Sequence, residues 1–207
     1  MKAMPGFEFC AFRFLEQWQD EEYALFNAIS STPTDKDIRK ALSYFQVSRT
    51  FEGLKEPAKV ALILKSLVQV RTDQSLAASE DKVNKLTELL LPEFNQNNLS
   101  AASKLLWLSY RDPYVIYDSR AVRALTRDFG YRFQDRDYAA YSRSWRQEYA
   151  IRQTSIEAAV KELPKGRIFM RSYPFSDDAL LAMAKEPWFL ERVFDIFLWE
   201  VGADIEQ

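Results

Sequence analysis

Lys104 and Asp118 are the residues whose types and spacing could do chemistry together. Both lie in the stretch from 98 to 123, which predicts one helix, a short connector and a second helix. Ser100 suits the cap of the first helix and Asp118 that of the second, because their side-chain oxygens can accept hydrogen bonds from the N–H groups of a first turn. We therefore expect an amine near the start of one helix and a carboxylate at the start of the next, facing one pocket.

Each of these two residues also has a purely structural interpretation. An Asp at a helix start is usually only a cap. A Lys among Ala and Ser residues is usually a solvated charge, because charged side chains mostly lie outside. Both interpretations stay open at the level of the sequence, and only the pairing of the two residues favours chemistry.

The amino-acid composition excludes several classes of catalytic and metal-binding site. The chain contains no His and a single Cys, Cys10. These counts exclude imidazole acid–base catalysis, Ser-His-Asp and Cys-His sites, an intrachain disulfide, and thiolate zinc or iron–sulfur sites. Any reaction must therefore use carboxylates, Lys, Tyr, Ser or Arg. We expect no metal and no cofactor.

Charge is distributed unevenly along the chain, although the net charge is only −2. Residues 104–171 carry 14 basic and 8 acidic side chains, which gives +6, and 11 of the 14 basic residues are Arg. Residues 172–207 carry 2 basic and 8 acidic side chains, which gives −6. Because Arg suits bidentate phosphate contacts, this asymmetry indicates an anionic partner.

Helical periodicity predicts the elements that must position these residues. We expect helices over 7–30, from Thr34 or Asp35 to about 45, from Pro57 to about 70, from Ser79 to just before Pro92, and over the central stretch. Beyond it, we expect helices from Asp118 to Phe129, from about 135 to 163, from Ser176 to about 183, and from Pro187 to about 198. Residues 167–175 could form a short extended segment.

Aromatic residues recur at helical spacing in the helix predicted over 135–163. They are Tyr138, Tyr141, Trp145 and Tyr149, with Ile156 in the same stripe. Such a stripe is more often core than a base-stacking platform. The fold class is therefore all-α, with about eight to ten helices in a single domain, which could form two lobes, about 1–95 and 96–207, flanking a cleft.

Targeting signals do not stand out. No run of about 18 uncharged apolar residues predicts a membrane span. The N-terminal residues lack an uninterrupted apolar segment followed by a small-residue cleavage site. We therefore expect a cytoplasmic protein without a membrane partner.

The central stretch resembles the helix-hairpin-helix DNA glycosylase superfamily. The resemblance rests on the run from Ala102 to Trp107, the run from Val115 to Arg120 and the closing segment from Arg192 to Gly202. The most similar branch is the bacterial proteins with an 8-oxoguanine DNA glycosylase fold. In the superfamily, a Lys opens the helix after the hairpin and an Asp follows near the start of the next helix, which are the positions of Lys104 and Asp118.

The resemblance implies a glycosylase-like architecture and a reaction on DNA. Lys104 would attack C1′ of a damaged nucleotide and form a Schiff base, and Asp118 would stabilise the cationic sugar or activate the nucleophile. The flipped base would enter a pocket lined by aromatic residues. The candidate substrate-binding residues are Trp107, Tyr110, Tyr114 and Tyr117, and the candidate nucleic-acid-binding residues are Arg120, Arg123 and Arg127.

Three functions stay open on these observations. The first is a DNA glycosylase that excises a modified, for example oxidised, base and can have AP-lyase activity. The second is an inactive or repurposed module of this fold that works with a protein partner encoded nearby, for example in bacterial antiviral defence. The acidic C-terminal segment, the aromatic first helix and the absence of Gly from 97 to 102 motivate the second. The third is a different enzyme that acts on free nucleosides or modified bases.

Overall fold

The computed structural model describes residues 4–47, 54–166 and 174–203. These residues form eleven α-helices, two π-helical segments and no β-strand, so the all-α fold class is confirmed. Most of the extended segment predicted at 167–175 lies outside the described residues.

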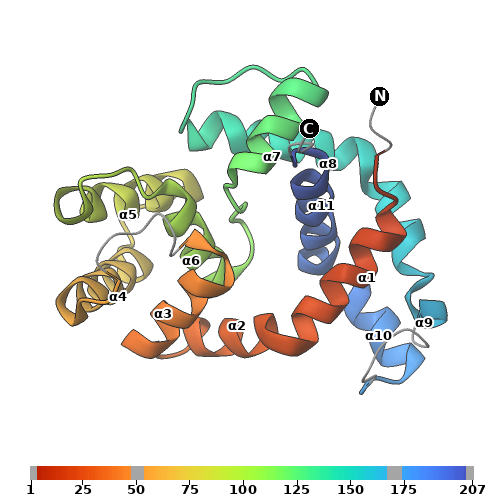
Figure 1. Cartoon of the computed structure of the whole chain (residues 1–207), viewed down its shortest axis with the longest axis horizontal. Coiled ribbons are helices and arrows are strands. Elements are labelled where there is room, and N and C mark those ends of the chain that lie inside the picture. The colour runs from red at the N-terminus through yellow and green to blue at the C-terminus, as the bar shows by residue number, and fades with distance from the viewer. Residues whose placement is uncertain (1–3, 48–53, 167–173, 204–207) are drawn as a thin grey trace. The chain divides into compact units, whose positions relative to one another are not determined.

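The elements follow one another in this order (Figure 1). They are α1 (Phe7–Gln17), η1 (Trp18–Glu22), α2 (Tyr23–Ser30), α3 (Asp35–Tyr44), α4 (Pro57–Thr72), α5 (Ser79–Phe94), α6 (Leu99–Tyr110), α7 (Ser119–Arg123), η3 (Ala124–Asp128), α8 (Tyr138–Val160), α9 (Leu163–Gly166), α10 (Asp177–Ala184) and α11 (Pro187–Val201). Both η1 and η3 are π-helical, and η1 joins α1 to α2 without a break, so residues 7–30 are helical throughout as predicted.

The chain divides into two compact units. Unit 1 comprises residues 1–20, 118–134 and 140–207, and unit 2 comprises residues 21–117 and 135–139. Each unit therefore combines segments that are far apart in the sequence. The predicted lobes, 1–95 and 96–207, are a different division of the chain and stay a prediction.

In unit 1, α11 is the central element. It contacts α1, α7, η3 and α10. Its Phe194 ring lies 5.0 Å from the Trp145 ring of α8, edge to face, and its Phe189 lies 4.8 Å from Phe14 of α1. The aromatic stripe of α8 is thus mostly core, because Tyr138, Tyr141, Trp145 and Ile156 are at most 1% exposed.

In unit 2, α6 is the central element. It contacts α2, α3, α4 and α5. Every residue from Leu99 to Ser109 is buried except Ser100. A helix that is apolar nearly all round belongs inside a bundle, and this sequence, LSAASKLLWLSY, has that character.

Three predicted helix boundaries need correction. Helix α6 begins at Leu99 with Asn98 at its N-cap position, so the predicted cap at Ser100 is wrong. Helix α5 has Ala78 at its N-cap rather than Ser79, and it continues through Pro92 to Phe94. Pro92 lies in the last turn, where its missing N–H removes one hydrogen bond, and the helix ends at its C-cap residue, Asn95, whose backbone is left-handed with φ 48°.

The structure shows no helix that is both long and apolar enough to cross a membrane, within the residues it describes.

Candidate functional site

Lys104 lies in the second turn of α6, in unit 2, and is only 4% exposed. Its Nζ donates a hydrogen bond to Ser100 Oγ at 2.9 Å and lies 5.7 Å from the centroid of the Phe45 ring. The interpretation of Lys104 as a solvated charge is therefore wrong. Burial removes the ammonium from bulk water, and the hydroxyl one turn earlier in the same helix accepts one of its hydrogens.

Asp118 begins the segment of unit 1 that contains α7. Its Oδ1 accepts a hydrogen bond from the backbone N–H of Arg120 at 2.9 Å, so the predicted capping role is confirmed. Lys104 belongs to unit 2 and Asp118 to unit 1, and the convergence of the two side chains on one pocket stays a prediction.

The backbone of the connector between α6 and α7 is hydrogen-bonded to two side chains of unit 2, Ser103 and Tyr138. Ser103 Oγ accepts a hydrogen bond from the Tyr117 backbone N–H at 3.0 Å. The hydroxyl of Tyr138 accepts from the Val115 N–H at 3.0 Å and donates to the Val115 carbonyl at 2.8 Å. The residue that precedes Asp118 in the chain is therefore fixed to α6 beside Lys104.

The four predicted substrate-binding aromatics all lie in unit 2 but differ in exposure. Tyr110 is 42% exposed, whereas Trp107, Tyr114 and Tyr117 are 1%, 5% and 7% exposed. The rings of Tyr110 and Tyr114 are stacked with centroids 5.9 Å apart. Burial raises the pKa of Tyr114 to about 12, with a smaller contribution from Tyr110, so its hydroxyl stays protonated at neutral pH. Only Tyr110 offers a substantial part of its side chain to a ligand.

Two cations surround the exposed ring of Tyr110. Arg71 lies 5.6 Å and Lys82 lies 5.8 Å from its centroid. The Tyr110 hydroxyl donates to the Arg71 carbonyl at 3.1 Å, and the Arg71 guanidinium donates to the carbonyls of Ile29 and Ser30 at the end of α2. These contacts fix the position of the Tyr110 ring, and a fixed aromatic ring suits stacking with a planar ligand.

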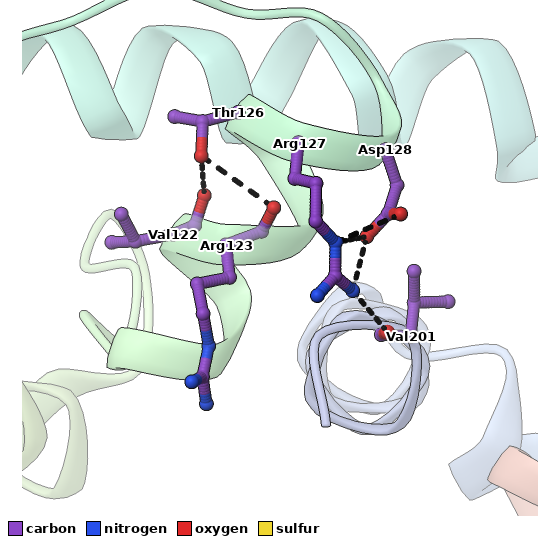
Figure 2. A network of polar contacts seen from close by, with 6 residues as sticks. All are labelled: Val122, Arg123, Thr126, Arg127, Asp128 and Val201. Carbon is purple, nitrogen blue, oxygen red and sulfur yellow. Dashed lines mark hydrogen bonds and ion pairs between the residues drawn. The ribbon is translucent and has the colours of Figure 1, made fainter. Parts of the chain in front are cut away.

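The three predicted nucleic-acid-binding arginines lie in α7 and η3 of unit 1. Arg127 forms an ion pair with Asp128 at 2.9 Å and donates to the Val201 carbonyl at 3.2 Å, so it caps the C-terminal end of α11 (Figure 2). Arg120 stacks on Trp199 with its guanidinium 3.8 Å from the ring centroid. In Figure 2 the Arg123 side chain points away from Arg127. Two of these arginines therefore join α7 and η3 to α11.

The sequence interpretation missed Ser100 and Asn98 as parts of the site. It treated Ser100 only as a cap and Asn98 not at all. Asn98 is 5% exposed, and within residues 4–47, 54–166 and 174–203 its Nδ2 has no hydrogen-bond partner. The spacing of Ser100 and Lys104, four residues apart, could have indicated their contact, because residues at i and i+4 are neighbours on a helix. The burial of Asn98 could not be seen in the sequence.

A metal site has no support from the described residues, which contain no group of three or more Cys, Asp and Glu side chains able to hold an ion. Comparison with known proteins found no family model, no curated protein and no solved structure that matches this chain.

Proposed function

We propose that this protein is a DNA glycosylase-like enzyme that excises a modified base, with Lys104 as nucleophile and Asp118 as the assisting carboxylate. The observation that carries the proposal is the burial of Lys104, which is 4% exposed. Lysine is almost never fully buried unless it is paired or has a function. The contact with Ser100 holds the amine in one position.

The anchored connector supports the same proposal. The hydrogen bond from Tyr117 N–H to Ser103 Oγ fixes the residue before Asp118 to the helix that carries Lys104. A reaction centre needs supporting contacts of this kind, because an error of about 1 Å can cost about 100-fold in rate. The capping bond to Arg120 N–H then fixes the Asp118 carboxylate on α7.

In the proposed reaction, the neutral amine of Lys104 attacks C1′ of the target nucleotide and the bond from C1′ to the base breaks. The base leaves with one proton of the amine, and the other proton passes to O4′ as the sugar ring opens, which gives a Schiff base between C1′ and Nζ. The Asp118 carboxylate stabilises the positive charge that develops on the sugar. The exposed part of Tyr110 is the surface on which a flipped base would stack.

The test is covalent trapping. The protein is incubated with oligonucleotides that carry 8-oxoguanine, other modified bases or an abasic site, in the presence of sodium borohydride, which reduces the Schiff base to a stable adduct. Wild type should form the adduct, Lys104→Gln should form none, and Asp118→Asn should react about 100- to 10,000-fold more slowly. Lys85→Gln is the matched control, since Lys85 lies in the same unit and is paired with Glu88 at the surface. If wild type forms no adduct with any of these substrates, the proposal is overturned.

A second candidate function is a repurposed module that acts through a protein partner. The observation that favours it is that Arg127 and Arg120 contact Val201 and Trp199 within unit 1. Arginines used in this way contribute less to phosphate binding, which dominates affinity for DNA. A pulldown that returns a stable protein partner, together with no retention on DNA at low salt, would support this function over the first.

A further inference from the structure

Ser100 and Lys104 have the geometry of a nucleophile and its general base. They lie four residues apart on α6, and Ser100 Oγ is 2.9 Å from Lys104 Nζ. A general base can take a proton from a hydroxyl group when the two heavy atoms are about 2.6–3.2 Å apart. We propose that Ser100 and Lys104 form a serine–lysine dyad that transfers the acyl group of an ester or amide substrate.

This activity goes beyond the glycosylase proposal. It uses Lys104 as a base rather than as a nucleophile, and it requires neither a nucleic acid nor Asp118. All its residues belong to unit 2, so the dyad is complete within that unit.

Exposure along α6 fits this division of roles. Between Leu99 and Ser109, Ser100 is the one residue that is partly exposed rather than buried, which makes it the residue of this segment that a substrate can approach. Lys104 is 4% exposed and lies against the ring of Phe45, which shields the amine from water. An accessible nucleophile beside a shielded base is the arrangement that acyl transfer needs.

The N-terminus of α6 supplies donors for the negative charge that develops on the substrate oxygen. The first N–H groups of a helix have no acceptor within the helix. Here the Leu99 N–H donates to Asn97 Oδ1 and the Ala102 N–H donates to the Asn98 carbonyl. Within the described part of the chain, the N–H groups of Ser100 and Ala101 make no hydrogen bond.

Asn98 adds a third donor at the same end of α6. It is the N-cap residue and is 5% exposed, and its Oδ1 accepts from Gln96 Nε2 at 2.9 Å. Its Nδ2 has no hydrogen-bond partner among the residues that the structure describes. A buried amide donor without an acceptor lowers the stability of the fold unless a ligand accepts its hydrogen bond. The carbonyl oxygen of an acyl substrate would accept hydrogen bonds from these donors, as in an oxyanion hole.

The reaction balances without a metal or a redox partner. In the structure the amine donates to the hydroxyl. With the amine neutral, the same contact lets the Ser100 hydroxyl donate to Nζ. Oγ attacks the carbonyl carbon, its proton passes to Nζ, and the bond from carbon to the leaving alcohol or amine breaks as Nζ returns the proton to that group. Water then attacks the acyl-serine with Nζ as base, which releases the acid and restores the hydroxyl.

The experiment uses a fluorophosphonate probe on the full chain. Oγ forms a bond to phosphorus, fluoride leaves, and the hydroxyl proton passes to Lys104. Peptide mapping should place the label on Ser100 of wild type, and Ser100→Ala should take up none. Ser109→Ala is the matched control, because Ser109 lies on the same helix with its hydroxyl bonded to the Leu105 carbonyl, and it should be labelled at the wild-type rate.

Variants of the base and of the donor separate a dyad from a reactive surface serine. Lys104→Met removes the amine, and Lys104→Arg keeps the charge but cannot act as a base. Both should be labelled about 100-fold more slowly or worse. Asn98→Ala should also lower the rate, by about 100-fold.

Three results would overturn the dyad: no label on folded wild type, a label on another serine, or an unchanged rate in Lys104→Arg. Circular dichroism checks that each variant is folded, and the Ser100→Ala comparison decides the labelled position even if the lysine variants are unstable. Borohydride trapping on an abasic-site oligonucleotide is scored separately. A labelled Ser100 without trapping rejects the glycosylase alone, and trapping without label rejects the dyad alone.

Discussion

Units 1 and 2 treat their buried charges in different ways. In unit 1, Asp195 accepts a hydrogen bond from Trp145 Nε1 at 2.9 Å and forms an ion pair with Arg192 at 3.4 Å, and both charged residues are at most 7% exposed. The contact with Trp145 joins α11 to α8. In unit 2, the buried ammonium of Lys104 donates to Ser100, one turn earlier in its own helix.

The difference concerns what each contact does for the fold. The Trp145–Asp195 bond links two helices, so its loss separates elements of the core. The Ser100–Lys104 bond joins no second element, so its loss should change stability less. A buried polar contact that contributes little to packing is a better candidate for chemistry than one that holds helices together.

The largest expected effect comes from removing the carboxylate in unit 1. Asp195→Ala should lower the free energy of unfolding by about 3–5 kcal/mol, because it removes a buried carboxylate that forms an ion pair with the buried Arg192 and accepts a hydrogen bond from Trp145 Nε1. Urea denaturation followed by tryptophan fluorescence measures it. Glu88→Ala, which removes an exposed ion pair with Lys85, is the control and should cost no more than about 1 kcal/mol. A loss as small as that of the control would contradict the structural role of Asp195.

A contact in unit 2 that does join two segments should have the next largest effect. Tyr138→Phe removes only the hydroxyl that bonds both the N–H and the carbonyl of Val115, and it leaves those buried groups unpaired. The cost should be about 1–3 kcal/mol. Hydrogen exchange of the Val115 amide should also speed up, while amides of α4 keep their protection. Unchanged exchange at Val115 would show that the hydroxyl does not hold the connector.

Ser100→Ala should separate stability from reactivity. Because Ser100 is half-buried and its hydroxyl accepts a hydrogen bond from Lys104 of the same helix, the loss of stability should be about 1–2 kcal/mol, below that of Asp195→Ala. The same variant should lose all fluorophosphonate labelling. The two readouts are denaturation and mass spectrometry. If Ser100→Ala loses as much stability as Asp195→Ala, the Ser100 contact is as important for packing as the contact that joins α11 to α8, and the proposed difference between the two units is wrong.

The stability of both units should also fall at alkaline pH. Burial raises the pKa of Cys10 in unit 1 from 9.0 to about 12 and that of Tyr114 in unit 2 from 10.0 to about 12. The unfolded chain therefore loses these protons first, so between about pH 9 and 12 the native state holds more protons and the free energy of unfolding falls as pH rises.

Urea midpoints at pH 7, 9 and 10.5 measure this fall. Tyr114→Phe should make it less steep above pH 10, because the variant lacks one of the groups with a raised pKa. The thiol of Cys10, which is fully buried, should react with a thiol reagent only after unfolding. Rapid reaction of Cys10 in the native protein, or an equally steep fall in Tyr114→Phe, would contradict the assignment.

The sequence predicted most helices because their local signals are strong. The periodic apolar residues from 7 to 30 gave a continuous helical segment, and Thr34, Asp118 and Ser176 cap their helices as predicted. The π-helical turns were not predictable, since one extra residue in a turn leaves the local pattern almost unchanged. The cap of α6 was misplaced because both Asn98 and Ser100 are good N-cap residues.

Only part of the candidate site could be predicted. The types and the spacing of Ser100, Lys104 and Asp118 are visible in the sequence. The burial of Lys104 is not, because it depends on Phe45 and on the helices that surround α6, which are distant in the chain. The contact of Arg127 with Val201 is likewise invisible, since it joins residues 74 positions apart.

By itself, the sequence determined that this protein is helical, that it lacks imidazole and that Lys104 and Asp118 lie near the starts of two successive helices. These properties follow from composition and from the period of a helix, which are local. The tertiary structure decided that α6 is the buried helix of its unit and that Ser100 alone among residues 99–109 is not buried. Exposure depends on which helices pack around α6, and packing is set by residues far from it in the chain.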